Sequence, residues 1–120
     1  MLKAFKIMVA AILITHTSYA SAFLDKNEVI LNASEAFAIS GFKKNNRLIA
    51  IGGGITQDIT AFISSIMFRG VKWLFFPTTL LAQGDSCIGS KTSINFNNYK
   101  NQIGGFYPPI KIYINIDFLK

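Results

Sequence analysis

Three consecutive glycines, Gly52 to Gly54, are the first residues of the chain whose type and spacing indicate chemistry. An apolar run, 48–51, precedes them, and a helix-forming segment follows. A strand that passes through a tight turn into a helix directs several backbone N–H groups and the positive end of the helix dipole at one point. Because glycine lacks a Cβ atom, a phosphate group can approach the main chain closely there. The turn therefore indicates a phosphate site, although a plain strand–turn–helix junction has the same pattern.

The dinucleotide-binding fingerprint G-x-G-x-x-G is matched only in part. Gly52 and Gly54 take its first two glycine positions, and Gln57 stands where the third glycine belongs. So short a glycine pattern is a weak signal, and a binding site needs support from other polar residues near the same turn.

Two polar segments further along the chain supply charged groups. Residues 85–95 (DSCIGSKTSIN) contain the carboxylate of Asp85 and the ammonium group of Lys91, and Lys100 and Asn101 follow in a second polar segment. Lysine ammonium groups bind phosphate oxygens through charge-assisted hydrogen bonds. These segments complete a site for a phosphorylated ligand if they meet the glycine turn. Otherwise they are solvated loops between strands.

Hydrophobic periodicity predicts a helix that begins at Asp58 and ends at Gly70, just beyond Arg69. Thr60 and Ser64 lie outside its apolar stripe, which consists of Ile59, Phe62, Ile63, Ile66 and Met67.

The elements around this helix predict a βαβ unit. Residues 48–51 form the first strand, and residues 71–76 (VKWLFF) form the second, which Pro77 ends. Strands joined in this way are parallel with a right-handed crossover, and ligands bind beyond their carboxyl ends. The glycine turn and the pair Thr78 and Thr79 both fall at that edge. Residues 28–31 and 110–116 are predicted as further strands, and residues 33–42 as a short helix.

Composition limits the class of protein. The 120 residues suffice for one small domain or a piece of a larger one, and 51% hydrophobic residues argue against disorder. The net charge of +6 is dispersed along the chain, so we expect no nucleic-acid partner. The single cysteine, Cys87, excludes an internal disulfide. With His16 as the only histidine, no metal cluster of usable spacing is present in the sequence.

Residues 1–22 have the order of a secretory signal peptide. Two lysines precede an apolar run at 7–14, and the triplet Ala20-Ser21-Ala22 follows. The run is too short to span a bilayer, so we expect no stable membrane span. The alternative is a buried first element of an α/β domain, in which such apolar runs also occur.

Three blocks of the sequence resemble one enzyme family. IGGGITQDITAF, RGVKWLFFPTTLLAQGDSCIGSKTSIN and KNQIGGFYPP are similar in order and spacing to the N-terminal, NAD-binding part of 3-dehydroquinate synthase, a sugar-phosphate cyclase. The resemblance runs from Phe42 to Lys120. It implies a truncated α/β chain with the Rossmann-like N-terminal domain of the dehydroquinate synthase fold, in which residues 42–120 are the NAD-binding core, 23–41 a short lead-in and 1–22 a signal-like or vestigial segment.

The resemblance also implies roles for individual residues. Asp85, Lys91 and Asn101 would be catalytic, contacting the reacting hydroxyl or holding the sugar phosphate. The NAD-binding residues would be Gly53, Gly54, Ile55, Thr56, Gln57, Asp58, Thr78, Thr79, Leu81, Lys91, Lys100, Phe118, Leu119 and Lys120.

Four positions depart from the family pattern. The family usually has glycine at the positions of Gln57, Ser90 and Tyr99, and valine at that of Gly84. These changes keep the chemical groups but alter the loop around the substrate. The alternatives to 3-dehydroquinate synthase are therefore a sedoheptulose-phosphate or cyclitol type of cyclase, or a non-catalytic decayed copy.

In the family, a divalent metal, zinc or cobalt, is bound by a glutamate and two histidines in a C-terminal helical domain. No such residues follow here, so we expect the metal only in a full-length form, and we expect this chain alone to be inactive. Family membership further implies a homodimer at full length, the shikimate pathway of aromatic amino acid biosynthesis, and a cytoplasmic location. Secretion is the alternative location if residues 1–22 act as a signal peptide.

Overall fold

The computed structural model describes residues 34–96 and 99–120. Within them, three parallel strands form a sheet in the order β1-β2-β5, where β1 is Leu48–Gly52, β2 is Trp73–Pro77 and β5 is Lys111–Ile112. Leu48 pairs with Trp73 at one end of β1, and Gly52 pairs with Pro77 at the other. The predicted parallel βαβ unit is confirmed, and the carboxyl ends of β1 and β2 lie side by side.

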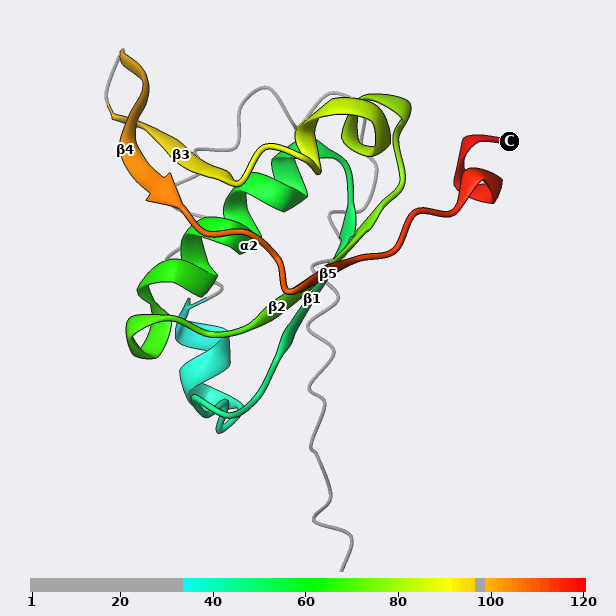
Figure 1. Cartoon of the computed structure of the whole chain (residues 1–120). Coiled ribbons are helices and arrows are strands. Elements are labelled where there is room, and N and C mark those ends of the chain that lie inside the picture. Colours follow the sequence, from blue (N-terminus) through cyan, green and yellow to red (C-terminus); the bar gives the residue numbers. More distant parts are fainter. Residues whose placement is uncertain (1–33, 97–98) are drawn as a thin grey trace, which may run out of the picture.

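The helix α2, Gly54–Ile66, lies between two layers. It packs against the parallel sheet on one side and on the other against an antiparallel hairpin of β3, Lys91–Phe96, and β4, Tyr99–Phe106 (Figure 1). The prediction that Thr60 and Ser64 lie off the buried face is wrong, because both are buried. A helix covered by two layers buries more of its circumference than a single apolar stripe.

Several predicted boundaries need correction. The helix begins at Gly54, four residues before Asp58, and ends at Ile66. A short 3₁₀ turn, η1 (Met67–Arg69), separates it from Gly70. Phe68 and Arg69 have positive φ angles of 49° and 61°, so the chain leaves the helix before the glycine.

Other segments differ in type from the prediction. The segment 85–95 is not one loop, because a π-helical turn, η2 (Ala82–Ser86), precedes β3. Lys100 and Asn101 belong to β4. In the predicted strand 110–116 only Lys111–Ile112 pairs with β2, and Pro77, expected after β2, is its last residue. A proline at the end of a strand is tolerated, since its missing N–H removes only a terminal hydrogen bond.

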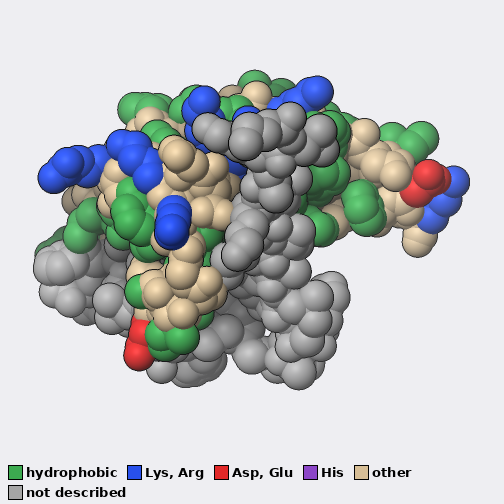
Figure 2. Space-filling view, turned by 90° about the horizontal axis from the view of Figure 1, so that it is seen from below, with side chains coloured by type: hydrophobic (Ala, Val, Ile, Leu, Met, Phe, Trp, Pro, Cys, Tyr) green, Lys and Arg blue, Asp and Glu red, His purple; other side chains and the backbone are tan. Residues whose placement is uncertain are grey.

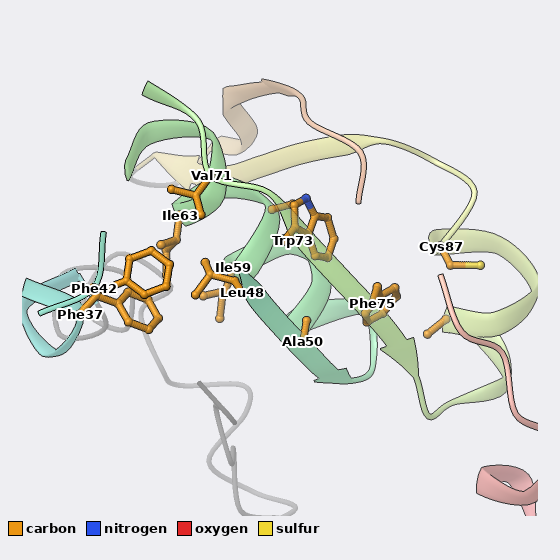
Figure 3. Packing of buried hydrophobic residues seen from close by; sticks show 12 residues of the cluster. Phe37, Phe42, Leu48, Ala50, Ile59, Ile63, Val71, Trp73, Phe75 and Cys87 are labelled. Carbon is orange, nitrogen blue, oxygen red and sulfur yellow. The ribbon is translucent and has the colours of Figure 1, made fainter. Parts of the chain in front are cut away.

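The core lies between α2 and the parallel sheet. Figure 3 shows Trp73 of β2 near its centre, with Ile59 and Ile63 of α2 between it and two phenylalanines at one end, and Phe75 toward the other end. The indole Nε1–H of Trp73 donates to the carbonyl oxygen of Tyr107 at 3.1 Å, so the buried ring keeps its hydrogen bond. The full cluster is Phe37, Phe42, Leu48, Ala50, Ile59, Ala61, Ile63, Val71, Trp73, Phe75, Ala82 and Cys87.

Two predictions concern residues outside the described ranges, namely the signal-like segment 1–22 and the strand 28–31. Of the helix predicted at 33–42, residues 34–39 are helical. No helix in the described part of the chain has the length and apolar character to cross a membrane. Figure 2 shows lysine and arginine side chains spread over the described part of one face, where acidic side chains are few.

The contact between the two hairpin strands leads to a first prediction. A Cβ atom on Gly104 would lie 1.6 Å from the carbonyl oxygen of Thr92, whereas a Cβ on Gly105 would meet no atom within 4 Å. Gly104→Ala should therefore lower the free energy of unfolding by about 1–3 kcal/mol. Gly105→Ala, the matched control, should change it by less than about 0.5 kcal/mol. Urea unfolding of both variants measures the difference, and equal midpoints would contradict the predicted clash.

Candidate functional site

The candidate site is built around the N-terminus of α2. Gly53 is the N-cap residue, and its carbonyl oxygen accepts a hydrogen bond from the N–H of Gln57 at 3.1 Å. Glycine has no side chain with which to cap the first N–H groups, and the first turn of α2 contains no acidic residue. The uncapped N–H groups and the helix dipole together favour an anion at this point.

The segment after β2 lies beside this turn. The N–H of Thr78 donates to the carbonyl oxygen of Gly52 at 2.9 Å, so the two strand ends are joined directly. A Cβ atom on Gly53 would lie 3.2 Å from Cγ2 of Thr79. The Thr79 side chain is itself held in place, because its Oγ1 accepts from the N–H of Ala82 at 3.2 Å. The predicted meeting of the glycine turn with Thr78 and Thr79 is thus present at the carboxyl edge of the sheet.

A third segment reaches the same turn from η2. A Cβ atom on Gly54 would lie 3.7 Å from Oγ of Ser86, its nearest neighbour within 4 Å. The side-chain amide of Gln57 donates to the carbonyl oxygen of Ser86 at 2.5 Å and to that of Gly89 at 3.4 Å. Oγ of Ser86 and Oε1 of Gln57 are buried and have no hydrogen-bond partner. Two unpaired polar atoms therefore lie beside the helix N-terminus.

The predicted ligand-binding residues of α2 differ in what they expose. The side chains of Thr56 and Gln57 are buried, and Thr56 covers Gly52, on which a Cβ atom would lie 2.4 Å from Oγ1 of Thr56. Thr56 can therefore reach an external ligand only through its main-chain N–H, whereas the N–H of Gln57 already donates to the carbonyl oxygen of Gly53. Ile55 is exposed, and Asp58 is half-buried.

The polar residues predicted to hold the substrate and the cofactor lie on three elements. Asp85 is exposed in η2, and Lys91 is exposed at the start of β3, close in sequence to Ser86. Lys100 and Asn101 follow Tyr99, which pairs with Phe96 at the tip of the hairpin, whereas Lys91 pairs with Phe106 at its base. Figure 1 shows this tip well away from the N-terminus of α2. Asp85 and Lys91 therefore flank, in the sequence, the residues Ser86 and Gly89 that contact Gln57, whereas Lys100 and Asn101 lie apart at the hairpin tip.

The last predicted cofactor residues belong to a short exposed 3₁₀ turn, η3 (Ile116–Leu119), and to Lys120, whose Nζ pairs with Asp117 at 2.6 Å. Figure 1 shows this segment extending to one side of the sheet. Its link to the site is a residue that the sequence analysis did not select. The buried amide of Gln83 donates to the carbonyl oxygens of Pro77 at 3.0 Å and Asn115 at 2.9 Å. A glutamine placed in the apolar run after β2 is the signal that could have revealed this role.

Side chains that could ligate a metal are few and dispersed in the part of the chain that the structure describes. Among residues 34–96 and 99–120, no group of three histidine, cysteine, aspartate or glutamate side chains is placed to hold a metal ion. Cys87 is buried, and its Sγ donates to the carbonyl oxygen of Gln83 at 3.1 Å.

Comparison with known proteins identifies the family. Residues 20–120 match the family model for the N-terminal part of 3-dehydroquinate synthase. The chain belongs to the 3-dehydroquinate synthase family. It is 46% identical over 96 residues to 3-dehydroquinate synthase of Buchnera aphidicola, covering 80% of this chain and 26% of that protein. It is 38% identical over 99 residues to the enzyme of Clostridium tetani, with 80% and 26% covered. The chain therefore spans about a quarter of the length of these relatives.

Solved structures support the same assignment. A 2-deoxy-scyllo-inosose synthase complexed with carbaglucose-6-phosphate, NAD+ and Co2+ superposes with a TM-score of 0.75 at 29% identity, covering 78% of this chain and 26% of that one. A 2-epi-5-epi-valiolone synthase from Streptomyces hygroscopicus with NAD+ and Zn2+ bound gives 0.72 at 29% identity, covering 88% and 28%. The predicted fold, the Rossmann-like N-terminal part of the dehydroquinate synthase fold, is confirmed.

The two hydrogen bonds of Gln83 lead to a second prediction. Gln83→Leu fills a similar volume but removes both hydrogen-bond donors of the amide. The buried carbonyl of Pro77 then loses its side-chain partner. The free energy of unfolding should fall by about 1–3 kcal/mol. Amide hydrogen exchange in residues 113–120 should also become faster. The control is Gln102→Leu, because the exposed Gln102 amide bonds only its neighbour, the carbonyl of Lys100. Unchanged exchange in residues 113–120 would show that Gln83 does not hold this segment.

Proposed function

We propose that this chain is the NAD-binding part of a 3-dehydroquinate synthase-like enzyme, a lyase that cyclises a sugar phosphate to a carbocycle with elimination of phosphate. The observation that carries the proposal is the uncapped N-terminus of α2, with Thr79 and Ser86 lying against its glycine turn. The family membership supports it, and so do the NAD+ complexes of the two cyclase structures.

The described residues fit NAD. Gly54 leaves open space beside the first helical turn, and the unpaired Oγ of Ser86 can serve a ligand there. In the proposal, the main-chain N–H groups of residues 53–56 bind the pyrophosphate, because an anion at a helix N-terminus is favoured by both hydrogen bonds and the dipole, and Gln57 and Asp58 lie along the cofactor beside them. Thr78 and Thr79 orient the nicotinamide half, and exposed Leu81 packs beside it. When bound, NAD supplies a hydride acceptor that is regenerated in each cycle.

The sugar phosphate is assigned to the side of the site formed by η2 and β3. Lys91 neutralises phosphate charge, and Asp85 accepts a hydrogen bond from the reacting hydroxyl group. Lys100 and Asn101 are proposed to add to this site in the complete enzyme, although they lie at the hairpin tip here. A sugar-phosphate analogue bound to the related 2-deoxy-scyllo-inosose synthase supports this class of ligand.

A second candidate is a cyclase for a different sugar phosphate. The two superposed enzymes, at 29% identity, are an inosose synthase and a valiolone synthase rather than 3-dehydroquinate synthases. Gln57 and Ser90, which depart from the usual family residues, lie within the segments that meet at the site. These observations favour a sedoheptulose-phosphate or cyclitol type of cyclase as the alternative.

The described residues do not fit a catalytic metal, so no step through a metal is derived for them. We propose that zinc or cobalt is held by a helical domain present in full-length relatives. Such a domain would also cover exposed apolar side chains of the segment after β2 and of η3, namely Leu80, Leu81, Ile88, Phe118 and Leu119. Residues 42–120 would be the NAD-binding core, the full-length form a homodimer, and its location the cytoplasm, where NAD and phosphorylated sugars are found.

The NAD proposal is tested with Gly54→Val. A Cβ atom at this position meets no atom closer than 3.7 Å, so the variant should fold, but its side chain occupies the space proposed for the pyrophosphate. NAD affinity measured by isothermal titration calorimetry should fall at least about tenfold, the loss of roughly one charge-assisted hydrogen bond. Gly105→Val, in open space on the hairpin, is the control and should bind like the parent. Equal NAD affinity in Gly54→Val and the parent would overturn the assignment.

A further inference from the structure

The side chain of Gln57 makes hydrogen bonds to a segment outside its own helix. Gln57 lies in the first turns of α2, yet its side chain is only 3% exposed and points to a segment about thirty residues away in sequence. Its amide nitrogen serves two carbonyl oxygens, those of Ser86 and Gly89. Because both partners are acceptors, they fix the orientation of the amide with nitrogen toward the loop.

The two hydrogen bonds join α2 to the segment 85–91, which carries Asp85 and leads to Lys91. Two other hydrogen bonds of this segment are local, since the N–H of Cys87 bonds the carbonyl of Ala82 and the N–H of Ile88 bonds that of Asp85, and a third runs to the end of the hairpin, where the N–H of Tyr107 donates to the carbonyl of Ser90 at 2.9 Å. Buried Cys87 and the bond from Tyr107 hold the segment to the core and to the hairpin. The Gln57 amide supplies its side-chain link to α2, at the N-terminal turns of the helix.

The link also has an electrostatic consequence. A helix N-terminus attracts any negative group, including the oxygen of a carbonyl dipole. The Gln57 amide donates hydrogen bonds to the carbonyl oxygens of Ser86 and Gly89. These oxygens therefore do not compete with an anion for the N–H groups of the first turn. The amide also holds Ser86 where its Oγ faces Gly54.

We propose that Gln57 is a positioning residue, which fixes the segment 85–91 over the N-terminus of α2 and keeps its carbonyl groups turned away from the anion site. The part of this inference that concerns ligand affinity rests on the proposed NAD function. The part that concerns the loop does not.

The test compares Gln57→Met with Gln57→His in the 120-residue chain. Methionine fills the same volume without donors. Histidine keeps a ring nitrogen, Nε2, at the same number of bonds from Cα as the glutamine nitrogen, and at about pH 8 the ring is neutral and can donate. The matched control is Gln102→Met, which removes an exposed amide from β4.

Amide hydrogen exchange followed by mass spectrometry should separate these variants. In Gln57→Met, exchange in residues 84–91 should be about tenfold faster than in the parent, while β1 stays unchanged. Gln57→His and Gln102→Met should exchange like the parent. Calorimetry should show the same order for NAD, with Gln57→Met binding about tenfold more weakly and Gln57→His close to the parent.

Two results would overturn the inference. One is parent-like exchange of residues 84–91 in Gln57→Met. The other is equal behaviour of the Met and His variants, which would mean that Gln57 acts by filling space. If Gln57→Met does not fold, Gln57→Asn replaces it, because its amide is one methylene too short to reach both carbonyls, and the same comparison with His applies. A parent chain that binds no NAD would refute the proposed function but leave the exchange comparison decisive for the loop.

Discussion

The structure depends on the junction at which β1 ends and α2 begins. The hydrogen bond from the N–H of Thr78 to the carbonyl of Gly52 joins the ends of the two central strands at this junction. Thr79 packs closely against Gly53, on which a Cβ atom would lie 3.2 Å from its Cγ2, whereas a Cβ atom on Gly54 would keep an ordinary van der Waals distance from Ser86. The same close packing that builds the turn therefore exposes a helix N-terminus at the carboxyl edge of the sheet.

Two buried glutamines extend this arrangement to parts of the chain that are distant in sequence. Gln57 links α2 to the segment after η2, and Gln83 links the end of β2 to the C-terminal segment at Asn115. In each case one side-chain amide donates to two main-chain carbonyls. Such bonds contribute most when the carbonyls are shielded from water, because an unpaired buried carbonyl is costly. These hydrogen bonds add to the apolar contacts of the two segments, in which Cys87 lies in the core and Tyr113 stacks on Phe76.

Sequence periodicity predicted the parallel strands and the helix because Ile59 and Ile63 of α2 and the aromatic residues of β2 are buried between the helix and the sheet. It missed the start of α2, since glycine is a poor helix former and Gly54 looks like a turn residue. It also missed the hairpin, because β4 is exposed along its whole length and so lacks an apolar and polar alternation. The hydrogen bonds from Gln57 to the carbonyls of Ser86 and Gly89 could not be predicted from periodicity, since main-chain carbonyl groups are the same in every residue type.

In the proposed function, the N-terminus of α2 binds NAD, rather than the dispersed positive charge of the chain. Titrating NAD into ¹⁵N-labelled protein and following backbone amide chemical shifts tests this proposal directly. The largest shifts should fall on residues 53–58 and on Thr78 and Thr79. Largest shifts on the basic segments 43–47 and 69–72, at the opposite edge of the sheet, would mean that NAD binds through surface charge and would contradict the account.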